Sequence, residues 1–107
     1  MSTPEFLIGL STASSKEEAR MIAETLVEEQ LAACVSIVPN IESIYKWKGS
    51  VERAEESLLV IKTTQEQTAH IIERIGQLHS YKVPEVIFLP IVSGAENYLA
   101  WLKSIGD

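Results

Sequence analysis

The sequence has little cysteine and no long apolar run. Cys34 is the single cysteine among 107 residues, so no disulfide framework can form within the chain. The apolar run near the amino terminus, Phe6–Leu10, is far shorter than the roughly 20 residues that span a bilayer. We therefore expect neither a signal peptide nor membrane insertion, and we predict a reduced, cytoplasmic setting.

Basic side chains are also scarce. The chain has 9 Lys and Arg against 15 Asp and Glu, a formal net charge of −6 at pH 7. This charge repels phosphate backbones, and the strand-like segment Glu55–Thr63 lacks the aromatic signature of RNA-recognition modules. Gly9 and Gly94 stand alone, so no glycine-rich phosphate loop is present. These absences argue against a nucleic-acid partner.

Patterns for catalysis and for structural zinc are missing as well. Ser11 and Thr12 are predicted to end the first strand, and no His or Asp is tied to them by spacing. An acylphosphatase-like hydrolase would need an arginine in the loop after that strand, where the sequence has none. His70 and His79 are nine residues apart, with no CxxC or HExxH motif. We predict no enzyme; a hydrolase site built across subunits is the least favoured alternative.

The sequence does contain a regular alternation of strand and helix patterns. Two overlapping capping boxes, Ser14 with Glu17 and Ser15 with Glu18, precede an amphipathic helix, and Thr64 with Gln67 forms a third such box before a second helix. The element order is β-α-β-β-α-β plus a carboxyl-terminal helix. This order predicts an α+β, ferredoxin-like split βαβ fold, as one domain over residues 1–107.

The segment between the two predicted helices is a long hairpin. Ala33–Lys48 and Val51–Lys62 have strand patterns and are joined at Gly49. A straight strand of the first segment's length would span about 50 Å, so the hairpin must bend or project. Pro39 is the expected bend because proline cannot donate to a sheet ladder. Tyr45 and Trp47 near the tip are large aromatics that predict an oligomer.

Four segments taken together resemble the CutA divalent-cation tolerance family. They cover the chain in order: LAACVSIVPNIESIYKWKG (residues 31–49), EESLLVIKT (55–63), LHSYKVPEVIFLPI (78–91) and NYLAWL (97–102). The resemblance implies a ferredoxin-like homotrimer in the cytoplasm, linked to copper and heavy-metal tolerance and without an established catalytic reaction. Its partners would be further copies of itself and divalent cations.

The resemblance also implies where a metal would bind. Some family members bind copper through a cysteine near the end of the first strand and a histidine pair after the second helix. Here Ser11 takes the first position and Leu78 precedes His79, so only His79 remains. With Cys34 and Glu85 as further ligands, we predict weak binding of copper or another divalent cation.

A second set of residues is expected at a subunit interface or cleft; it comprises Tyr45, Trp47, Lys62, Tyr81 and Pro84. The alternative function is therefore a trimeric sensor or adaptor that binds a small molecule or a partner protein in clefts between subunits. That alternative rests on analogy with trimeric signalling proteins of related fold.

Overall fold

The computed structural model describes residues 4–105. Its elements are β1 (Phe6–Ala13), α1 (Lys16–Glu28), β2 (Cys34–Trp47), β3 (Ser50–Thr64), the 3-10 turn η1 (Gln65–Gln67), α2 (Thr68–Leu78), β4 (Val86–Pro90) and α3 (Glu96–Lys103). The predicted element order and the α+β class are confirmed.

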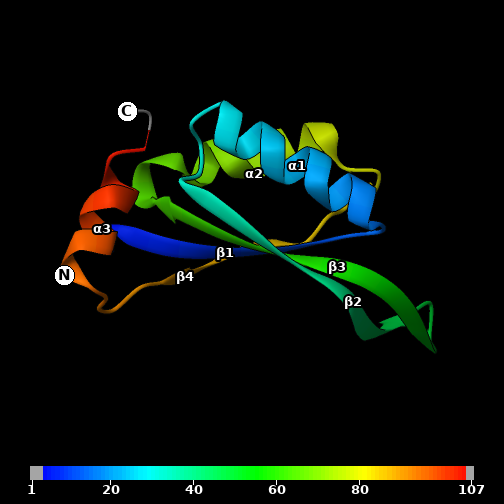
Figure 1. Cartoon of the computed structure of the whole chain (residues 1–107). Coiled ribbons are helices and arrows are strands. Elements are labelled where there is room, and N and C mark those ends of the chain that lie inside the picture. The colour runs from blue at the N-terminus through cyan, green and yellow to red at the C-terminus, as the bar shows by residue number, and fades with distance from the viewer. Residues whose placement is uncertain (1–3, 106–107) are drawn as a thin grey trace.

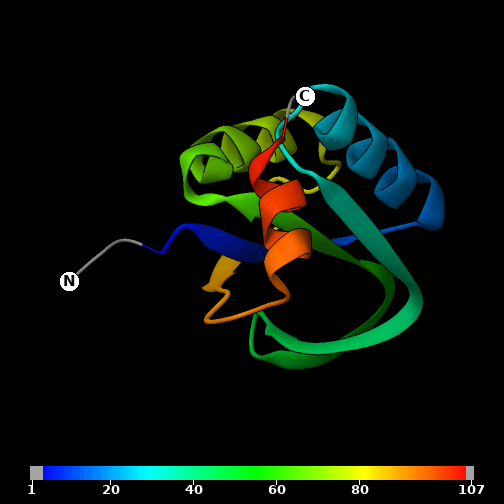
Figure 2. The ribbon, with the colours of Figure 1, turned by 60° about the vertical axis from the view of Figure 1, so that its left-hand side comes forward.

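The four strands form one antiparallel sheet in the order β2-β3-β1-β4. This arrangement leaves β2 and β4 as the two edges. Helices α1 and α2 lie side by side on one face of the sheet (Figure 1). Helix α3 packs against β1 and β3 and stands across the end of the sheet where β1 begins (Figure 2). Most of the opposite face carries no helix.

The hydrophobic core lies between the sheet and the two helices. Its fully buried side chains include Ile22 and Leu26 of α1, Leu59 and Ile61 of β3, and Ile71 and Ile75 of α2. Gly9 faces this core between Ile61 and Phe88, where a Cβ atom would lie only 2.7 Å from the Phe88 ring. The isolated glycine of the first strand therefore has a packing role.

The start of α1 follows the predicted capping pattern. Ser15 is the N-cap, and its Oγ accepts a hydrogen bond from the Glu18 backbone N–H at 3.1 Å. The third predicted capping box is wrong, because Thr64 still pairs with Phe6 in the sheet and makes no side-chain cap. The ladder even continues one residue further, from Gln65 N–H to the Glu5 carbonyl at 2.9 Å. Helix α2 consequently begins only at Thr68.

Strand β1 runs to Ala13, one residue beyond its predicted end at Thr12. Ser11 opposes Leu59 of β3 and Val86 of β4. Ser11 and Thr12 were expected at an open strand end, where they could be exposed; instead both are buried. The reason is tertiary: two neighbouring strands flank these residues, which no local pattern indicates.

The long hairpin bends and projects, as predicted. Its pairing runs from Cys34 opposite Lys62 to Trp47 opposite Ser50, with a register shift between Val38 and Ile41. This bulge contains Pro39 and Asn40, whose φ of 60° is a left-handed conformation. The arm extends past the helices and curves towards the uncovered face (Figure 1). The molecule accordingly measures 44 × 31 × 23 Å.

The uncovered face and the arm expose apolar side chains. Ile87 and Leu89 of β4 alternate with the core residue Phe88 and so point away from the helices; each is 51% exposed. On the arm, Tyr45 is 47% and Trp47 60% exposed. Large apolar surfaces of this kind mark interaction sites in soluble proteins.

Candidate functional site

Five residues gather where β1 ends and α2 gives way to the following loop, four through their side chains and Thr12 through its backbone carbonyl. We call this group the β1-end cluster; it comprises Thr12, Glu18, Glu56, His79 and Tyr81. Helix α1 supplies Glu18 from its first turn, and β3 supplies Glu56. His79 is the C-cap of α2, and its extended backbone directs the chain towards Tyr81. Three elements and a loop therefore meet at this end of the sheet.

His79 is held at both ring nitrogens. Its side chain is fully buried, with Nε2 2.7 Å from the Thr12 carbonyl oxygen and Nδ1 accepting the Tyr81 backbone N–H at 3.0 Å. Because a carbonyl oxygen can only accept, Nε2 carries the proton and Nδ1 is the unprotonated nitrogen. A metal ion at His79 would have to displace one of these hydrogen bonds.

Glu18 is the most strongly perturbed carboxylate of the cluster. It accepts hydrogen bonds from Ser80 N–H at 2.7 Å and from both N–H and Oγ of Ser14 at 2.9 Å. Burial alone would raise its pKa, but these hydrogen bonds outweigh that effect and lower the pKa from 4.5 to about 2. An ionised Glu18 thus ties the start of α1 to the loop after α2, 3.7 Å from His79 Nδ1.

Tyr81 completes the cluster on the side of β3. Its hydroxyl donates a hydrogen bond to Glu56 Oε2 at 2.7 Å, and its ring centroid lies 4.7 Å from that of His79. Burial first, and then the Glu56 hydrogen bond and charge, raise the pKa of Tyr81 to about 12. Tyr45 of the arm lies close enough to Tyr81 to contribute to this rise. Tyr81 therefore keeps its phenolic proton at neutral pH and remains a hydrogen-bond donor to Glu56.

The structure does not bring the three predicted metal ligands together. Cys34 opposes Lys62, whereas Thr12, which contacts His79, opposes Leu58, four residues or about 13 Å further along β3. Glu85 precedes Val86, the partner of Ser11, so it lies at the same end of the sheet as His79 but is exposed. In the part of the chain that the structure describes, no three His, Cys, Asp or Glu side chains are placed to hold a metal ion.

The predicted cleft residues divide between separate regions. Tyr45 and Trp47 lie on the arm, and Trp47 has Lys48 Nζ 5.8 Å from its ring centroid. Tyr81 and half-buried Pro84 lie in the loop before β4, so Tyr45 and Tyr81 are the pair that the fold brings near each other. Lys62 lies apart, near the end of β3, opposite Cys34 at the start of the edge strand β2.

Sequence patterns did not identify two members of the β1-end cluster as functional residues. Glu18 was recognised only as a capping residue, although its side chain reaches Ser80, 62 residues away in the chain. Glu56 carries no local signal, because its partner Tyr81 is 25 residues away and no motif joins them.

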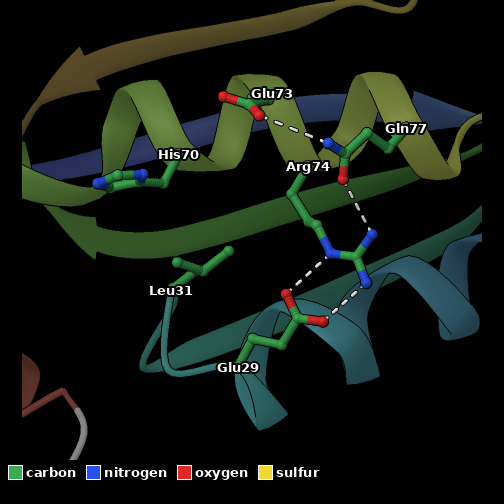
Figure 3. A pocket seen from close by; sticks show the side chains of 6 residues that line it. All are labelled: Glu29, Leu31, His70, Glu73, Arg74 and Gln77. Carbon is green, nitrogen blue, oxygen red and sulfur yellow. Dashed lines mark hydrogen bonds and ion pairs between the residues drawn. The ribbon is translucent and has the colours of Figure 1, made fainter.

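A separate hollow of about 230 Å³ lies between the end of α1 and α2. Arg74 reaches across it and donates two hydrogen bonds to the Glu29 carboxylate, at 2.7 and 2.8 Å (Figure 3). This pairing lowers the pKa of Glu29 below its ordinary value. His70 also lines the hollow but points away from the ion pair (Figure 3). Glu73, which also lines the hollow, accepts a hydrogen bond from Gln77 at 3.5 Å. No three potential metal ligands of the described residues converge here.

Ser11, which the family resemblance places where some members have a cysteine ligand, leads to the first prediction. It is fully buried, and its Oγ is the only buried side-chain oxygen within residues 4–105 without a hydrogen-bond partner. Ser11→Ala should raise the free energy of unfolding by about 1 kcal/mol, because an unpaired buried hydroxyl is costly. Urea unfolding measures this change.

Thr63→Val is the matched control for Ser11→Ala. Thr63 is equally buried, but its Oγ1 donates to the Leu31 carbonyl at 2.7 Å. Loss of this hydrogen bond in Thr63→Val should lower the free energy of unfolding by about 1 kcal/mol. If both variants are destabilised, the Ser11 hydroxyl makes a favourable interaction and the prediction is wrong.

No helix in the described residues is long and apolar enough to cross a membrane.

Comparison with known proteins gives a consistent result over almost the whole chain. A family model described as CutA1 divalent ion tolerance protein matches residues 7–105. The divalent-cation tolerance protein CutA of Thermus thermophilus is 51% identical over 94 residues, which are 88% of this chain and 91% of that protein. The chloroplastic protein CutA of Arabidopsis thaliana is 47% identical over 93 residues, 87% of this chain but only 51% of that longer protein.

Solved structures agree with these sequence matches. The divalent cation tolerance protein of Thermus thermophilus superposes with a TM-score of 0.92 at 48% identity, over 94% of this chain and 97% of that one. CutA1 from Oryza sativa gives a TM-score of 0.91 at 44% identity, over 94% of this chain and 93% of that one.

Proposed function

The chain belongs to the CutA1 divalent ion tolerance protein family, and we propose that it is a cytoplasmic homotrimer that responds to divalent cations. It binds copper or another divalent cation weakly and catalyses no reaction. The observation that carries this proposal is the family match over residues 7–105 together with His79 at the β1-end cluster. Cytoplasmic location rests on the single, unpaired Cys34.

The geometry of His79 supports weak rather than tight binding. Nδ1 is the nitrogen with a lone pair, and that lone pair already accepts the Tyr81 N–H. A cation bound there must break this hydrogen bond and leave a backbone N–H unpaired, which costs about 1–3 kcal/mol. Cys34 and Glu85 of the same chain do not converge on His79, so further ligands would come from solvent or from another subunit.

Three features support the trimer. The sheet has free edges at β2 and β4, and free edges tend to pair in natural proteins. The apolar side chains of the uncovered face and of the arm would gain from burial against a second copy. The arm projects past its own helices (Figure 1). In the proposed assembly it contacts a neighbouring subunit, and head-to-tail contacts of this kind form a ring when the rotation between subunits closes.

Copper titration tests the cation proposal. Calorimetry with Cu²⁺ at about pH 7.5 and about pH 5.5 should give weaker binding at the lower pH, because protons compete for the imidazole nitrogen. His79→Ala should reduce binding at the higher pH by about tenfold or more. His70→Ala is the matched control, since His70 is exposed and outside the β1-end cluster, and it should bind like the wild type. If His79→Ala also binds like the wild type, His79 is a structural residue.

The sensor or adaptor alternative has one observation in its favour. Tyr81 of the loop donates a hydrogen bond to Glu56, and Tyr45 of the arm lies close enough to affect the pKa of Tyr81. We infer that a second copy could close over this place. A thermal-shift screen with metabolites separates the two functions. A metabolite that stabilises both the wild type and His79→Ala, with no effect of Cu²⁺ on either, would favour the sensor.

A further inference from the structure

Glu56 is the most buried of the acidic residues that the structure describes, with 9% of its surface exposed. Its Oε2 accepts the Tyr81 hydroxyl at 2.7 Å, and no basic side chain of residues 4–105 lies within ion-pair distance of it. Its Oε1 accepts no hydrogen bond from these residues. Oε1 is nevertheless not enclosed, because the Ser11 hydroxyl is the only enclosed side-chain oxygen or nitrogen there without a partner. Glu56 therefore keeps one acceptor oxygen open at a place largely withdrawn from water.

Glu18, the other carboxylate of the β1-end cluster, is compensated by its donors. It accepts hydrogen bonds from N–H and Oγ of Ser14 and from N–H of Ser80. The remaining carboxylates of the described residues are exposed to water. A carboxylate has about four acceptor positions, and withdrawing it from water with a single neutral donor is unfavourable. A cation on Oε1 of Glu56 would remove that cost.

The groups around Glu56 are aromatic and acidic. Tyr45 lies on the same face of the arm as Glu56, because it is four residues from Ile41, which opposes Glu56 in the ladder. The charges of both Glu56 and Glu18 contribute to the raised pKa of Tyr81. Phenol rings and carboxylates both attract cations. Since the proposed assembly covers this surface, we look for the cation on a neighbouring subunit.

Lys48 lies in the turn at the tip of the arm and has no carboxylate of residues 4–105 within ion-pair distance. Its Nζ lies 5.8 Å from the ring centroid of Trp47, so the two side chains stand together at the tip. The tip stands clear of the helices of its own subunit (Figure 1). Ile41, opposite Glu56, is six residues before Trp47, so a subunit's own tip lies about 20 Å from its own Glu56. An ion pair between Lys48 and Glu56 therefore requires two copies of the chain.

We propose that the ammonium group of Lys48 in one subunit binds the Glu56 carboxylate of the next subunit. The Trp47 ring then lies beside Tyr45 and Tyr81 of that subunit. This inference rests on the proposed trimer and deepens it, because the β1-end cluster is complete only when a neighbouring arm supplies a residue. A charge-assisted hydrogen bond of this kind is stronger than a neutral one. Every subunit carries both halves of the contact, so the contact runs head to tail around a ring.

Zero-length cross-linking tests the contact in the unmodified protein. A carbodiimide joins a carboxylate to a touching amine as an amide, and takes up the water that is lost to become a urea. Isotopically light and heavy protein, unfolded and refolded together, should give a Lys48–Glu56 peptide pair that joins light to heavy chains, as read by mass spectrometry. A link only within single chains overturns the proposal. So do links from Glu56 to another lysine, or links elsewhere with none at Glu56.

Variants measure what the contact contributes to assembly. Lys48→Gln and Glu56→Gln should each lower the association constant of the trimer by about tenfold or more, because each leaves a charge unpaired in the interface. The double variant should lose less than the two single losses combined, since both remove the same interaction. Lys46→Gln is the matched control: Lys46 is an exposed lysine of the same arm, but it alternates with Tyr45 and Trp47 and so lies on the other face. It should assemble like the wild type.

Light scattering over a dilution series, at fixed ionic strength, separates this inference from the proposed function. A monomeric wild type contradicts the trimer itself. A trimeric wild type in which Lys48→Gln and Lys46→Gln have equal effects overturns the contact between Lys48 and Glu56 but not the trimer. Full additivity of the Lys48→Gln and Glu56→Gln losses does the same. If Glu56→Gln fails to fold, the comparison of Lys48→Gln with Lys46→Gln and the cross-link in the wild type decide the question.

Discussion

Trp47→Ala is expected to shift the protein from the proposed trimer towards monomer. The Trp47 side chain is 60% exposed near the tip of an arm that projects from its own subunit. Tryptophan is prominent among the residues that dominate binding energy at interfaces, and its truncation at a buried centre costs about 2–4 kcal/mol. A loss of about 2 kcal/mol per contact lowers the association constant about 30-fold.

The measurement is mass by light scattering over a dilution series. The wild type should remain trimeric at micromolar concentration, while Trp47→Ala should dissociate at concentrations where the wild type does not. Its melting temperature should also depend more strongly on protein concentration. Ile72→Ala is the matched control, because Ile72 is a half-exposed apolar residue of α2, on the layer away from the uncovered face. A monomeric wild type at micromolar concentration contradicts the assembly.

Glu18→Gln should be the most destabilising of the single changes at the β1-end cluster. The folded-state pKa of Glu18, about 2, lies below its usual value of 4.5, so the folded protein favours the ionised carboxylate. The contribution of Glu18 to the free energy of unfolding is fully present at a pH above its unfolded-state pKa of 4.5. It is lost as the pH falls from about 4.5 towards the folded-state pKa of about 2. From this difference we expect a loss of about 2–3 kcal/mol at neutral pH.

Urea unfolding at about pH 7 and about pH 3, at one protein concentration, measures both the loss and its pH dependence. The difference in free energy of unfolding between the wild type and Glu18→Gln should be smaller at the lower pH. Glu17→Gln is the control: Glu17 shares the first turn of α1 and the helix-dipole interaction, but it is exposed. The prediction is wrong if this difference does not change with pH, or if Glu17→Gln lowers the free energy of unfolding as much as Glu18→Gln. Either result would show that the hydrogen bonds of the ionised Glu18 do not stabilise the fold.

Local patterns in the sequence predicted the elements well. Ser15 caps α1 because its side chain needs only the N–H three residues later, and Pro39 marks the bulge because it lacks a backbone donor. Where a residue had the local pattern of a helix cap but could also pair in the sheet, the structure has the sheet pairing. Thr64 has the sequence of a helix cap, but its backbone remains in the ladder opposite Phe6.

The candidate site was predictable only in part. The resemblance identified His79 and Tyr81, which the structure does place in one cluster. It also offered Cys34 as a ligand, but Cys34 lies about 13 Å along the sheet from the position of Thr12. Strand register sets that separation, and register depends on how distant segments align rather than on the residues next to Cys34.

By itself, the sequence determined the order of strands and helices, the bend of the arm at Pro39 and the family. These follow from periodicity, backbone chemistry and motifs, which act over a few neighbouring residues. Only the tertiary structure decided that Ser11 is buried without a hydrogen-bond partner among residues 4–105 and that both ring nitrogens of His79 are occupied. The physical reason is that burial and hydrogen bonding depend on which distant groups meet, and the packing of α1 and α2 on one face of the sheet determines those meetings.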